Sequence, residues 1–464
     1  MKNLLASARP VVALALFAGL SGCDIKDSLL EPQQPGIIGP EATGSPTAAD
    51  ALRKGALDRL ARASEGDGNG GLWPMSGLLA DEWKSGDTFV QRVETDGRTM
   101  QNNNAELIEE YQENHRARQS ARDAIGSLRE FLATPLRYQA EMWWVMGFAE
   151  MNLAENWCNG VPYSVIVDGV PTYDTPRTSA AGLTLAMTHL DSALALATET
   201  DTAAVTVNRA VRLTRARVLQ AQGDFDGAAA AVAGIPTSWV YLQSHSLTTF
   251  DVPNWSLNQS QKRWVVGDSF DITGRIVNAI PFASSGDPRV PVVGESVASS
   301  AGVAFDNNTP FVYQTIFTRT DNVPILSGVD ARLIEAEAEL RNNDLVGMMA
   351  ILNALRASPQ FLSSSYSSPV MAPLGLPLSQ AAAADLFFRE KAFWQFGRGY
   401  RLSDLRRQLR LYNGAPYNKT EANTYPRGTF FKTAQAYGAD IMFPMVTDET
   451  PNPNWSGDCL DRNP

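Results

Sequence analysis

The stretch DLFFREKAFWQFGRGYRLSDLRRQLR, residues 385–410, is the most informative part of this sequence. Its apolar and small residues recur every three or four positions, at Phe388, Ala392, Phe396, Gly399, Leu402, Leu405 and Leu409. This spacing is typical of a helix that turns one face toward the protein core. The stretch therefore predicts a helical segment packed against neighbouring elements.

Charged side chains occupy the other faces of this stretch. Arg401 and Asp404 are three positions apart, a spacing at which two side chains can pair along one helix. Arg398, Arg406 and Arg407 lie on other faces. We expect a buried or half-buried ion pair that holds the helix against its neighbours, and we prefer this structural role to a catalytic one.

Helical patterns extend outward from this stretch through most of the chain. Ser45-Pro46 has the residue types of a helix cap and first helical position, after which Leu52, Ala56 and Leu60 recur at a spacing of four. Further amphipathic helices are expected at about 104–133, 137–157, 180–198, 206–222 and 226–233.

Two segments repeat a helix, a short polar turn and a second helix. They are ARVLQAQGDFDGAAAAV at 216–232 and AEAELRNNDLVGMMAIL at 336–352. The pattern is similar to the helix pairs of tetratricopeptide repeats, which stack to bury a shared apolar face. Between them, residues 236–325 are richer in aromatic and β-branched residues, Gly and Pro. The fold class expected is mostly α, with tetratricopeptide-like helix pairs forming a scaffold for an irregular, loop-rich region with few short strands.

The N-terminal residues have the features of an export signal. Lys2 and Arg9 supply positive charge, and residues 11–20 (VVALALFAGL) form an apolar core too short to span a bilayer. The sequence LSGC that ends at Cys23 resembles a bacterial lipobox, so we expect residues 1–22 to be removed and Cys23 to carry the lipid. An ordinary secretory peptide is the alternative. Residues 23–46 then form a lipidated, flexible tether, and residues 47–464 the body.

The charge, the cysteines and the missing motifs limit the functions that this sequence can have. The formal net charge of the 464 residues is −11, which makes nucleic acid an unfavourable partner. Cys158 and Cys459 either pair in an oxidising compartment or remain as free buried thiols. With three histidines and no HExxH or GxSxG motif, the sequence offers no metal, cofactor or nucleophile site that we can name.

Several motifs together resemble the SusD/RagB family. Gly399 to Arg407 (GYRLSDLRR) looks like the family's G-x-R-x-x-D-L-R-R helix, and residues 331–340 (ARLIEAEAEL) look like its A-E-A helix. Asp287-Pro288-Arg289 resembles its D-P-R turn, for which we expect a structural role. The segments at 160–162 (GVP), 443–445 (FPM) and 452–454 (NPN) match further family elements in the same order.

This resemblance implies a non-catalytic lipoprotein of the bacterial outer membrane, lipid-anchored and facing the cell surface. Such proteins bind a nutrient, here an oligosaccharide or alternatively a peptide, and pass it to a TonB-dependent (SusC-like) transporter. The irregular region 236–325 then becomes the ligand-binding region, supported by the helical scaffold.

A saccharide site needs aromatic rings beside planar hydrogen-bonding groups, because sugars present both C–H faces and hydroxyls. Two places in the sequence supply them, and the candidates are Trp83, Phe89, Arg92, Trp239, Tyr241, Trp255, Trp264 and Tyr313. For each aromatic residue, packing in the core is the competing interpretation. Trp143, Trp144 and Trp394 lie in helical patterns and are expected in the core.

Two other functions remain open. Exported proteins of this size are often glycoside hydrolases, but sequence spacing cannot place two carboxylates across a cleft. A helical-repeat scaffold that binds only proteins is the second alternative, and the aromatic-rich region 236–325 argues mildly against it.

Overall fold

The computed structural model describes residues 44–464. The expected signal sequence, Cys23 and nearly all of the expected tether lie outside the described residues. Pro46 opens the first helix, and the Ser45 side chain accepts a hydrogen bond from the Ala48 amide at 3.2 Å, as the cap pattern predicts. Within residues 44–464, no helix combines the length and apolar character that a membrane span requires.

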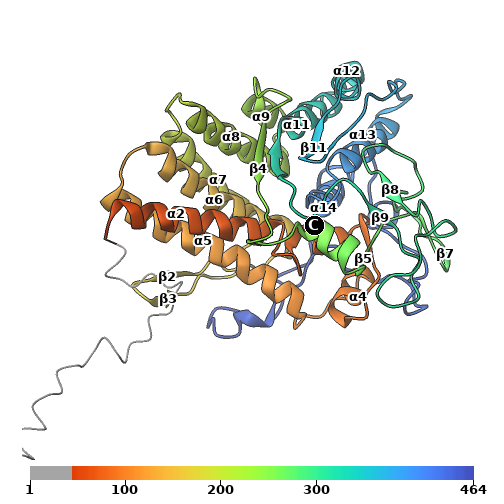
Figure 1. The fold of residues 1–464 in the computed structure, drawn as a ribbon, viewed down its shortest axis with the longest axis horizontal. Coiled ribbons are helices and arrows are strands. Elements are labelled where there is room, and N and C mark those ends of the chain that lie inside the picture. The colour runs from red at the N-terminus through yellow and green to blue at the C-terminus, as the bar shows by residue number, and fades with distance from the viewer. Residues whose placement is uncertain (1–43) are drawn as a thin grey trace, which may run out of the picture.

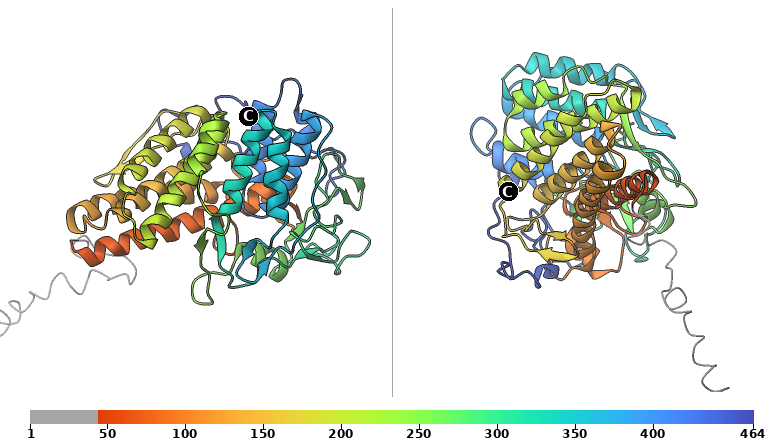
Figure 2. Two further views of the ribbon diagram at one scale, coloured as in Figure 1. Left: turned by 90° about the horizontal axis from the view of Figure 1, so that it is seen from above. Right: turned by 90° about the vertical axis from the view of Figure 1, so that its left-hand side faces the viewer.

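Long helices packed side by side form one half of the body (Figure 1). The helix α2 packs on α5, α5 on α6, α6 on α7, and α7 on α8. Their bounds are α2 Pro46–Ser64, α5 Ala105–Phe131, α6 Leu136–Asn156, α7 Ser179–Leu196, α8 Thr202–Gln222 and α9 Phe225–Val232. The five helices expected between residues 104 and 233 are therefore confirmed. Figure 2 shows the same helices from two further directions.

The second group of helices continues this arrangement, since α11 packs on α9, α12 and α13. The bounds are α11 Gly328–Arg341, α12 Leu345–Arg356, α13 Gln380–Trp394 and α14 Arg401–Leu411. The shorter helices are α3 Leu72–Leu79, α4 Val90–Asp96, α10 Pro253–Trp255 and α15 Glu421–Thr424, with a π turn at Ser256–Ser260 and a 3-10 turn at Thr447–Glu449.

The two repeated segments form helix pairs with the same turn. Gly223 (φ +90°) ends α8, and Asp224 then caps α9 by accepting a hydrogen bond from the Gly227 amide at 2.9 Å. In the second pair, Asn343 (φ +61°) precedes Asp344, which caps α12 in the same way at 2.8 Å. A left-handed residue followed by an Asp cap is thus the local signal that reverses the chain in both pairs.

Residues 385–410 do not form one continuous helix, which corrects the sequence expectation. The chain leaves α13 after Trp394 and enters α14 at Arg401. Gly397 and Gly399 both have left-handed φ values, +71° and +73°, so the helix cannot pass through them. A Cβ atom on Gly399 would lie 2.1 Å from the Trp73 ring, and glycine is therefore needed for space as well as for conformation.

The strands are short and pair in two-stranded antiparallel sheets. The first group comprises β1 Trp83–Ser85, β2 Val165–Val167, β3 Val170–Thr172, β4 Val240–Gln243, β5 Trp264–Val266 and β6 Phe270–Asp271. The second comprises β7 Gly274–Arg275, β8 Val292–Val293, β9 Tyr313–Gln314, β10 Val323–Ser327, β11 Phe361–Ser363 and β12 Tyr366–Ser367. Seven of these lie within or overlap residues 236–325, so the loop-rich region with few short strands is confirmed.

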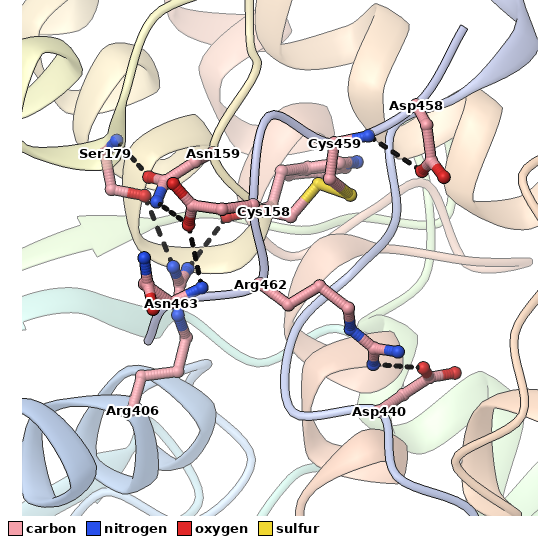
Figure 3. The surroundings of a disulfide bond; sticks show 11 residues. Cys158, Asn159, Ser179, Arg406, Asp440, Asp458, Cys459, Arg462 and Asn463 are labelled. Atoms are coloured by element: carbon pink, nitrogen blue, oxygen red, sulfur yellow. Dashed lines mark hydrogen bonds and ion pairs between the residues drawn. A yellow bond between two sulfur atoms is a disulfide. The ribbon is translucent and has the colours of Figure 1, made fainter.

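Cys158 and Cys459 form a disulfide bond, which decides between the two alternatives left open by the sequence. Their Cα atoms are 5.8 Å apart although 301 residues separate them in the chain (Figure 3). Next to the bond, the Leu460 amide donates to the Asn159 carbonyl at 2.7 Å. The C-terminal tail is thereby attached to the segment that follows α6.

Charged residues of α14 are buried, but the pairing differs from the expected one. Arg401 does not pair along the helix with Asp404; it binds both carboxylate oxygens of Asp81, at 2.6 and 2.9 Å. Asp404 instead contacts Lys391 at 2.5 Å and Arg407 at 2.8 Å. Because these groups are almost fully buried, each charge needs a close partner of opposite sign.

Arg406 uses its charge to hold the end of another helix. Its guanidinium donates to the carbonyl oxygens of Ala154, Glu155 and Trp157 at 3.2, 2.6 and 2.9 Å. The last carbonyl oxygens of a helix have no hydrogen-bond donor within the helix and carry partial negative charge. A guanidinium at this position donates the missing hydrogen bonds and neutralises the partial charge. The hydrogen bonds of Arg406 thus attach helix α14 to the C-terminal end of α6.

Candidate ligand-binding site

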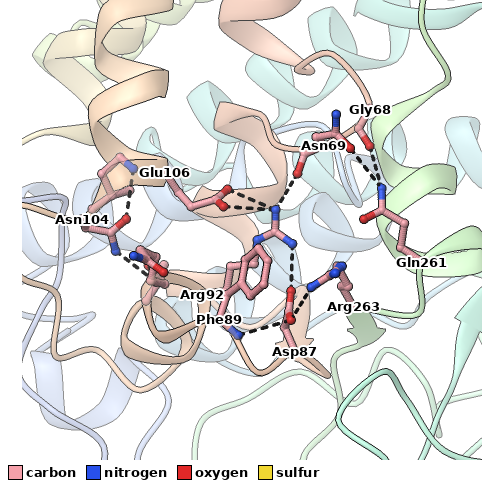
Figure 4. Close-up of polar contacts among 12 residues, drawn as sticks. Gly68, Asn69, Asp87, Phe89, Arg92, Asn104, Glu106, Gln261 and Arg263 are labelled. Carbon is pink, nitrogen blue, oxygen red and sulfur yellow. Dashed lines mark hydrogen bonds and ion pairs between the residues drawn. The ribbon is translucent and has the colours of Figure 1, made fainter.

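Phe89 and Arg92 lie where the chain leaves β1 and enters α4. Phe89 is the N-terminal flanking residue of α4, and its ring is 46% exposed. Arg92, one turn further on, is 4% exposed, and its guanidinium carbon lies 5.2 Å from the centre of the Phe89 ring. An exposed ring beside a buried cation therefore stands at this helix start (Figure 4).

Asp87 organises the charged groups beneath this ring. Its two carboxylate oxygens accept hydrogen bonds from Arg92 at 2.8 Å and from Arg263 at 2.6 Å. Burial alone raises the pKa of Asp87, but the hydrogen bonds from Arg263 and Arg92 outweigh it and hold this pKa below its ordinary value. The carboxylate is therefore ionised at neutral pH, and both arginines are held in place by it.

The pairing of β1 with β5 brings Arg263 to Asp87. Ser85 pairs with Trp264, and the Gly86 amide donates to the Arg263 carbonyl at 2.8 Å, so the ends of the two strands leave the sheet together. Gly86 is needed here because a Cβ atom would lie 2.5 Å from Ala304.

Arg263 lies between two exposed aromatic rings. Its guanidinium carbon is 4.5 Å from the centre of the Phe89 ring and 3.8 Å from that of Phe305. Phe305 is 44% exposed, almost as much as Phe89. We call the surface formed by Phe89, Arg263 and Phe305 the Phe89–Phe305 face.

A second ion pair attaches the Phe305 loop to this face. Lys432 pairs with Asp306 and donates to the Asp87 carbonyl at 2.7 Å. Burial raises the pKa of Asp306, but the hydrogen bonds from Lys432, Thr309 and Asn308 together outweigh it and lower this pKa overall. Residues from four distant parts of the chain thus meet at one place, and their positions are set by buried or half-buried charge pairs.

The chemistry available at the Phe89–Phe305 face is that of binding. Exposed aromatic rings offer flat apolar surfaces, and the guanidinium of Arg263, 16% exposed, offers planar donors. Asp87, the carboxylate at its centre, has a side chain with no exposed surface and two arginine partners. It is therefore an ionised structural group and not a proton donor to a ligand.

The architecture around this face has known counterparts. Comparison with solved structures finds a SusD-like carbohydrate-binding protein from Bacteroides vulgatus, with a TM-score of 0.61 and 13% identity, covering 90% of this chain and 98% of that one. A SusD-like carbohydrate-binding protein from Bacteroides fragilis gives 0.59 and 14%, covering 89% and 99%. This chain has the SusD fold.

A laminarin-binding SusD-like protein matches equally well, with a TM-score of 0.59, 14% identity and coverage of 90% of this chain and 100% of that one. The whole body of this chain therefore corresponds to whole SusD-like domains. No protein-family model matches the sequence, and no curated protein does either. At this level of identity the SusD likeness lies in the fold.

Two of the candidate aromatics lie in the core of the SusD-like fold. Trp83 and Trp264 are each 1% exposed. The centre of the Trp83 ring lies 4.8 Å from that of Phe396, and the Trp264 indole N–H donates to the Pro74 carbonyl at 3.3 Å. Neither ring has a face open to a ligand, so the structure favours packing over ligand contact for both.

Tyr241 lies on β4, and Trp239 directly precedes this strand. Trp239 is 7% exposed, and Tyr241 is half-buried against Trp144, with their ring centres 4.8 Å apart. The Tyr241 hydroxyl donates to Glu141 at 3.2 Å. These contacts place Tyr241 between the strand pair β4–β10 and the helix α6, and Trp239 is buried, so packing is favoured for both.

Trp255 and Tyr313 are half-buried, each beside a partner ring or cation. The guanidinium carbon of Arg319 lies 5.6 Å from the Trp255 ring centre. Tyr313 stacks on Phe311 at 5.5 Å, and the ammonium group of Lys262 lies 5.4 Å from Phe311. Since Lys262 precedes Arg263 in the chain, Tyr313 is connected through Phe311 and Lys262 to the Phe89–Phe305 face.

The D-P-R turn forms a buried ion pair with helix α13. Arg289 is 1% exposed and binds Asp287 at 2.9 and 2.7 Å and Glu390 of α13 at 2.7 and 2.9 Å. Across residues 44–464, no group of three or more His, Cys, Asp or Glu side chains is arranged to hold a metal ion.

Three residues of this region, Arg263, Phe305 and Lys432, were not among the candidates predicted from the sequence. For Phe305 a signal existed, because it precedes Asp306-Asn307-Asn308, a run of turn-forming residues that indicates a loop tip. An aromatic residue at a loop tip is a candidate for ligand contact. Nothing in the local sequence distinguishes Arg263 or Lys432 from other surface cations.

Proposed function

We propose that this protein binds an oligosaccharide on its Phe89–Phe305 face. The observation that carries the proposal is the arrangement of two exposed phenylalanine rings about the Arg263 guanidinium, on loops supported by a SusD-like scaffold. Sugar rings pack their C–H faces on aromatic rings while a guanidinium donates to hydroxyl or ring oxygens. Similar solved proteins are described as carbohydrate-binding, one of them as laminarin-binding, which supports the same class of ligand.

The charge pairs beneath the face support binding without rearrangement. Asp87 holds Arg92 and Arg263, and Lys432 holds the Phe305 loop through Asp306. A face whose side chains are already placed loses less conformational entropy when a ligand binds. We therefore expect the backbone of this region to change little on binding.

The test is calorimetric titration of the mature protein with laminarin, starch, xylan and peptide oligomers. Phe89→Ala is expected to weaken binding by about 1–2 kcal/mol, roughly five- to thirtyfold in Kd, because one stacking ring is lost. Phe270→Ala is the matched control, since Phe270 is 52% exposed on the separate β6–β7 hairpin. Equal affinities for wild type and Phe89→Ala contradict the proposed site, and binding of peptides alone contradicts the proposed ligand class.

We further propose that the protein is a surface lipoprotein that passes its ligand to a TonB-dependent transporter. The support is the signal-like residues 1–22 with LSGC at Cys23, together with the SusD fold of the body. Labelling with a radioactive fatty acid is expected for wild type and lost in Cys23→Ser. Purification through an affinity tag is expected to recover a β-barrel partner, and recovery of the protein alone counts against the partnership.

No catalytic step is assigned to the Phe89–Phe305 face. A glycosidase needs two carboxyl groups across the scissile bond, one of them a proton donor. Here Asp87 is buried and ionised between two arginines, and Asp306 is paired with Lys432. Release of reducing sugars during incubation with a bound oligosaccharide is the result that would overturn this assignment.

A further inference from the structure

A cleft of about 480 Å³ lies apart from the Phe89–Phe305 face and shares no residue with it. Its floor is the middle of α5, one side is the β2–β3 hairpin, and the other is the tail at 448–452. Figure 1 shows the hairpin and the dark blue tail on the same side of α5. The volume is within the range of small-molecule sites, which runs from roughly 300 to 1,000 Å³.

The tail wall of this cleft is held at both ends. Phe443 pairs with Trp157 and Asp461 with Asn159, and the disulfide of Cys459 lies between these contacts. The loop they enclose carries Asp448, Glu449 and Asn452, which line the cleft. The Asn452 amide also donates to the Asp174 carbonyl beyond the hairpin, at 3.1 Å. The cleft is therefore formed before any ligand arrives.

Two carboxylates in the tail wall have neutral partners. Glu449 accepts a hydrogen bond from the Tyr111 hydroxyl at 2.7 Å and one from Asn452 at 3.3 Å, and Asp448 accepts from the Gln112 amide. Neither carboxylate takes part in an ion pair formed within residues 44–464. Burial raises the pKa of Glu449, as expected for a carboxylate with no cation beside it.

The positive groups of the cleft are outnumbered by its carboxylates. Arg59 and Arg116 both bind Glu113, at 3.3 and 2.5 Å. Arg118 donates to His115 Nδ1 at 3.1 Å, so Nδ1 is the acceptor and Nε2 carries the ring proton. Burial, assisted by the charge of Arg118, holds the pKa of His115 well below its usual range. Three carboxylates, Glu113, Asp448 and Glu449, thus stand against the two arginines Arg59 and Arg116, so the ionised cleft has an excess of negative charge.

The opposite wall is apolar and aromatic. Tyr173 is 40% exposed and Ile166 is 49% exposed, and Pro171 and Pro451 complete the lining on either side. Aromatic faces attract cations as well as apolar groups, and the attraction is strongest where water is partly excluded. An apolar body beside a positive group matches both walls of the cleft.

From these observations we propose that the cleft binds an organic cation, namely an ammonium group carried on an apolar or ring-shaped body. The ammonium group donates to Glu449 and Asp448, and the body packs on Tyr173, Ile166 and the prolines. A carboxylate–ammonium hydrogen bond is about twice as strong as a neutral one, so charge complementarity gives the site its selectivity. This site does not depend on the oligosaccharide site proposed above, because the two share no residue.

The test uses two pairs of probes in which acetylation of the amine removes the positive charge. They are phenylalaninamide against N-acetylphenylalaninamide, and glucosamine against N-acetylglucosamine, titrated into the mature protein and followed by NMR chemical-shift changes of the probe or protein. Binding of the charged member of either pair, at least tenfold tighter than its neutral partner, supports the proposal, and the pair that binds identifies a peptide amine or an amino sugar as the source. Absence of binding by all four, or equal binding within both pairs, overturns it.

Matched variants locate the binding. Glu449→Gln keeps the side-chain shape and the acceptor for Tyr111 but removes the charge. This variant is expected to bind the charged probe at least tenfold more weakly than the wild type. Glu130→Gln, an exposed change at the far end of α5, is the control and should leave the affinity unchanged. Tyr173→Ala gives an independent test, because this exposed ring can be removed without opening the core. Charged-probe binding that survives both Glu449→Gln and Tyr173→Ala refutes the assignment.

Discussion

The buried pair between Arg401 and Asp81 gives the sharpest test of the fold. Arg401 Nε and Nη2 donate to Oδ1 and Oδ2 of Asp81 at 2.6 and 2.9 Å, and both side chains are almost fully buried. Asp81 also accepts the Ile280 amide at 2.8 Å, so it joins α14 to the loop-rich region. The perturbation is Arg401→Met, which keeps much of the volume and removes the charge and its donors.

The expected loss is about 3–5 kcal/mol of unfolding free energy, because Asp81 remains as a buried carboxylate without a cation partner. A double-mutant cycle with Asp81→Asn should show a coupling of about 2–3 kcal/mol with Arg401→Met, as expected for residues in direct contact. The corresponding cycle with Asp404→Asn should show less than about 1 kcal/mol, since Asp404 is held by Lys391 and Arg407.

The assay is equilibrium urea unfolding of the mature protein, followed by tryptophan fluorescence and circular dichroism to check that both report one transition. The slope of free energy against urea should be unchanged in the variants, so that midpoint shifts report stability. A larger coupling between Arg401 and Asp404 than between Arg401 and Asp81 refutes the pairing seen in the structure. A loss below about 1 kcal/mol in Arg401→Met refutes the argument from burial.

Three further predictions concern pH, the tail and the helix break. Burial raises the pKa of Glu82 to about 8, so the folded state keeps a proton that the unfolded state releases near the ordinary glutamate value of about 4.5. The free energy of unfolding should therefore fall as the pH rises between these two values, and Glu82→Gln should flatten that fall in urea titrations at pH 5 and 8. Replacing Cys158 and Cys459 together by serine should lower the unfolding free energy by about 2–5 kcal/mol in urea titrations. The wild-type protein with its disulfide reduced is the control and should lose a similar amount of stability. Gly399→Ala should cost about 2–4 kcal/mol because of its φ of +73° and the nearby ring, whereas Gly414→Ala, with open space around it, should change thermal stability little.

The helices were predictable because their signals are local. The expected stretch 104–133 corresponds to α5 at Ala105–Phe131, and 137–157 to α6 at Leu136–Asn156. Apolar spacing and caps such as Asn104 act within a few residues, so the sequence contains the information in one place. The break between α13 and α14 was missed because apolar spacing continued past Gly397 and Gly399. The space beside these two glycines is filled by Asn254 and Trp73, which come from distant parts of the chain.

The candidate site was only half predictable. Phe89 and Arg92 come from one short segment rich in polar residues and were identified from it, and both lie at the site. Arg263, Phe305 and Lys432 join them across 174, 216 and 343 residues counted from Phe89, through a strand pair and buried charges. Such long-range contacts depend on how helices, strands and loops pack together, and a local sequence pattern does not predict this packing.

The sequence by itself determined the class of the fold, the helix pairs with their shared turn, and the loop-rich region between them. All of these follow from periodicity and capping, which are properties of neighbouring residues. The tertiary structure alone decided that Arg401 pairs with Asp81, that Cys158 meets Cys459, and that Phe89 stays exposed while Trp83 is buried. The physical reason is that burial and charge pairing depend on which distant segments come together, and every aromatic ring or charged group accepts several environments until packing selects one.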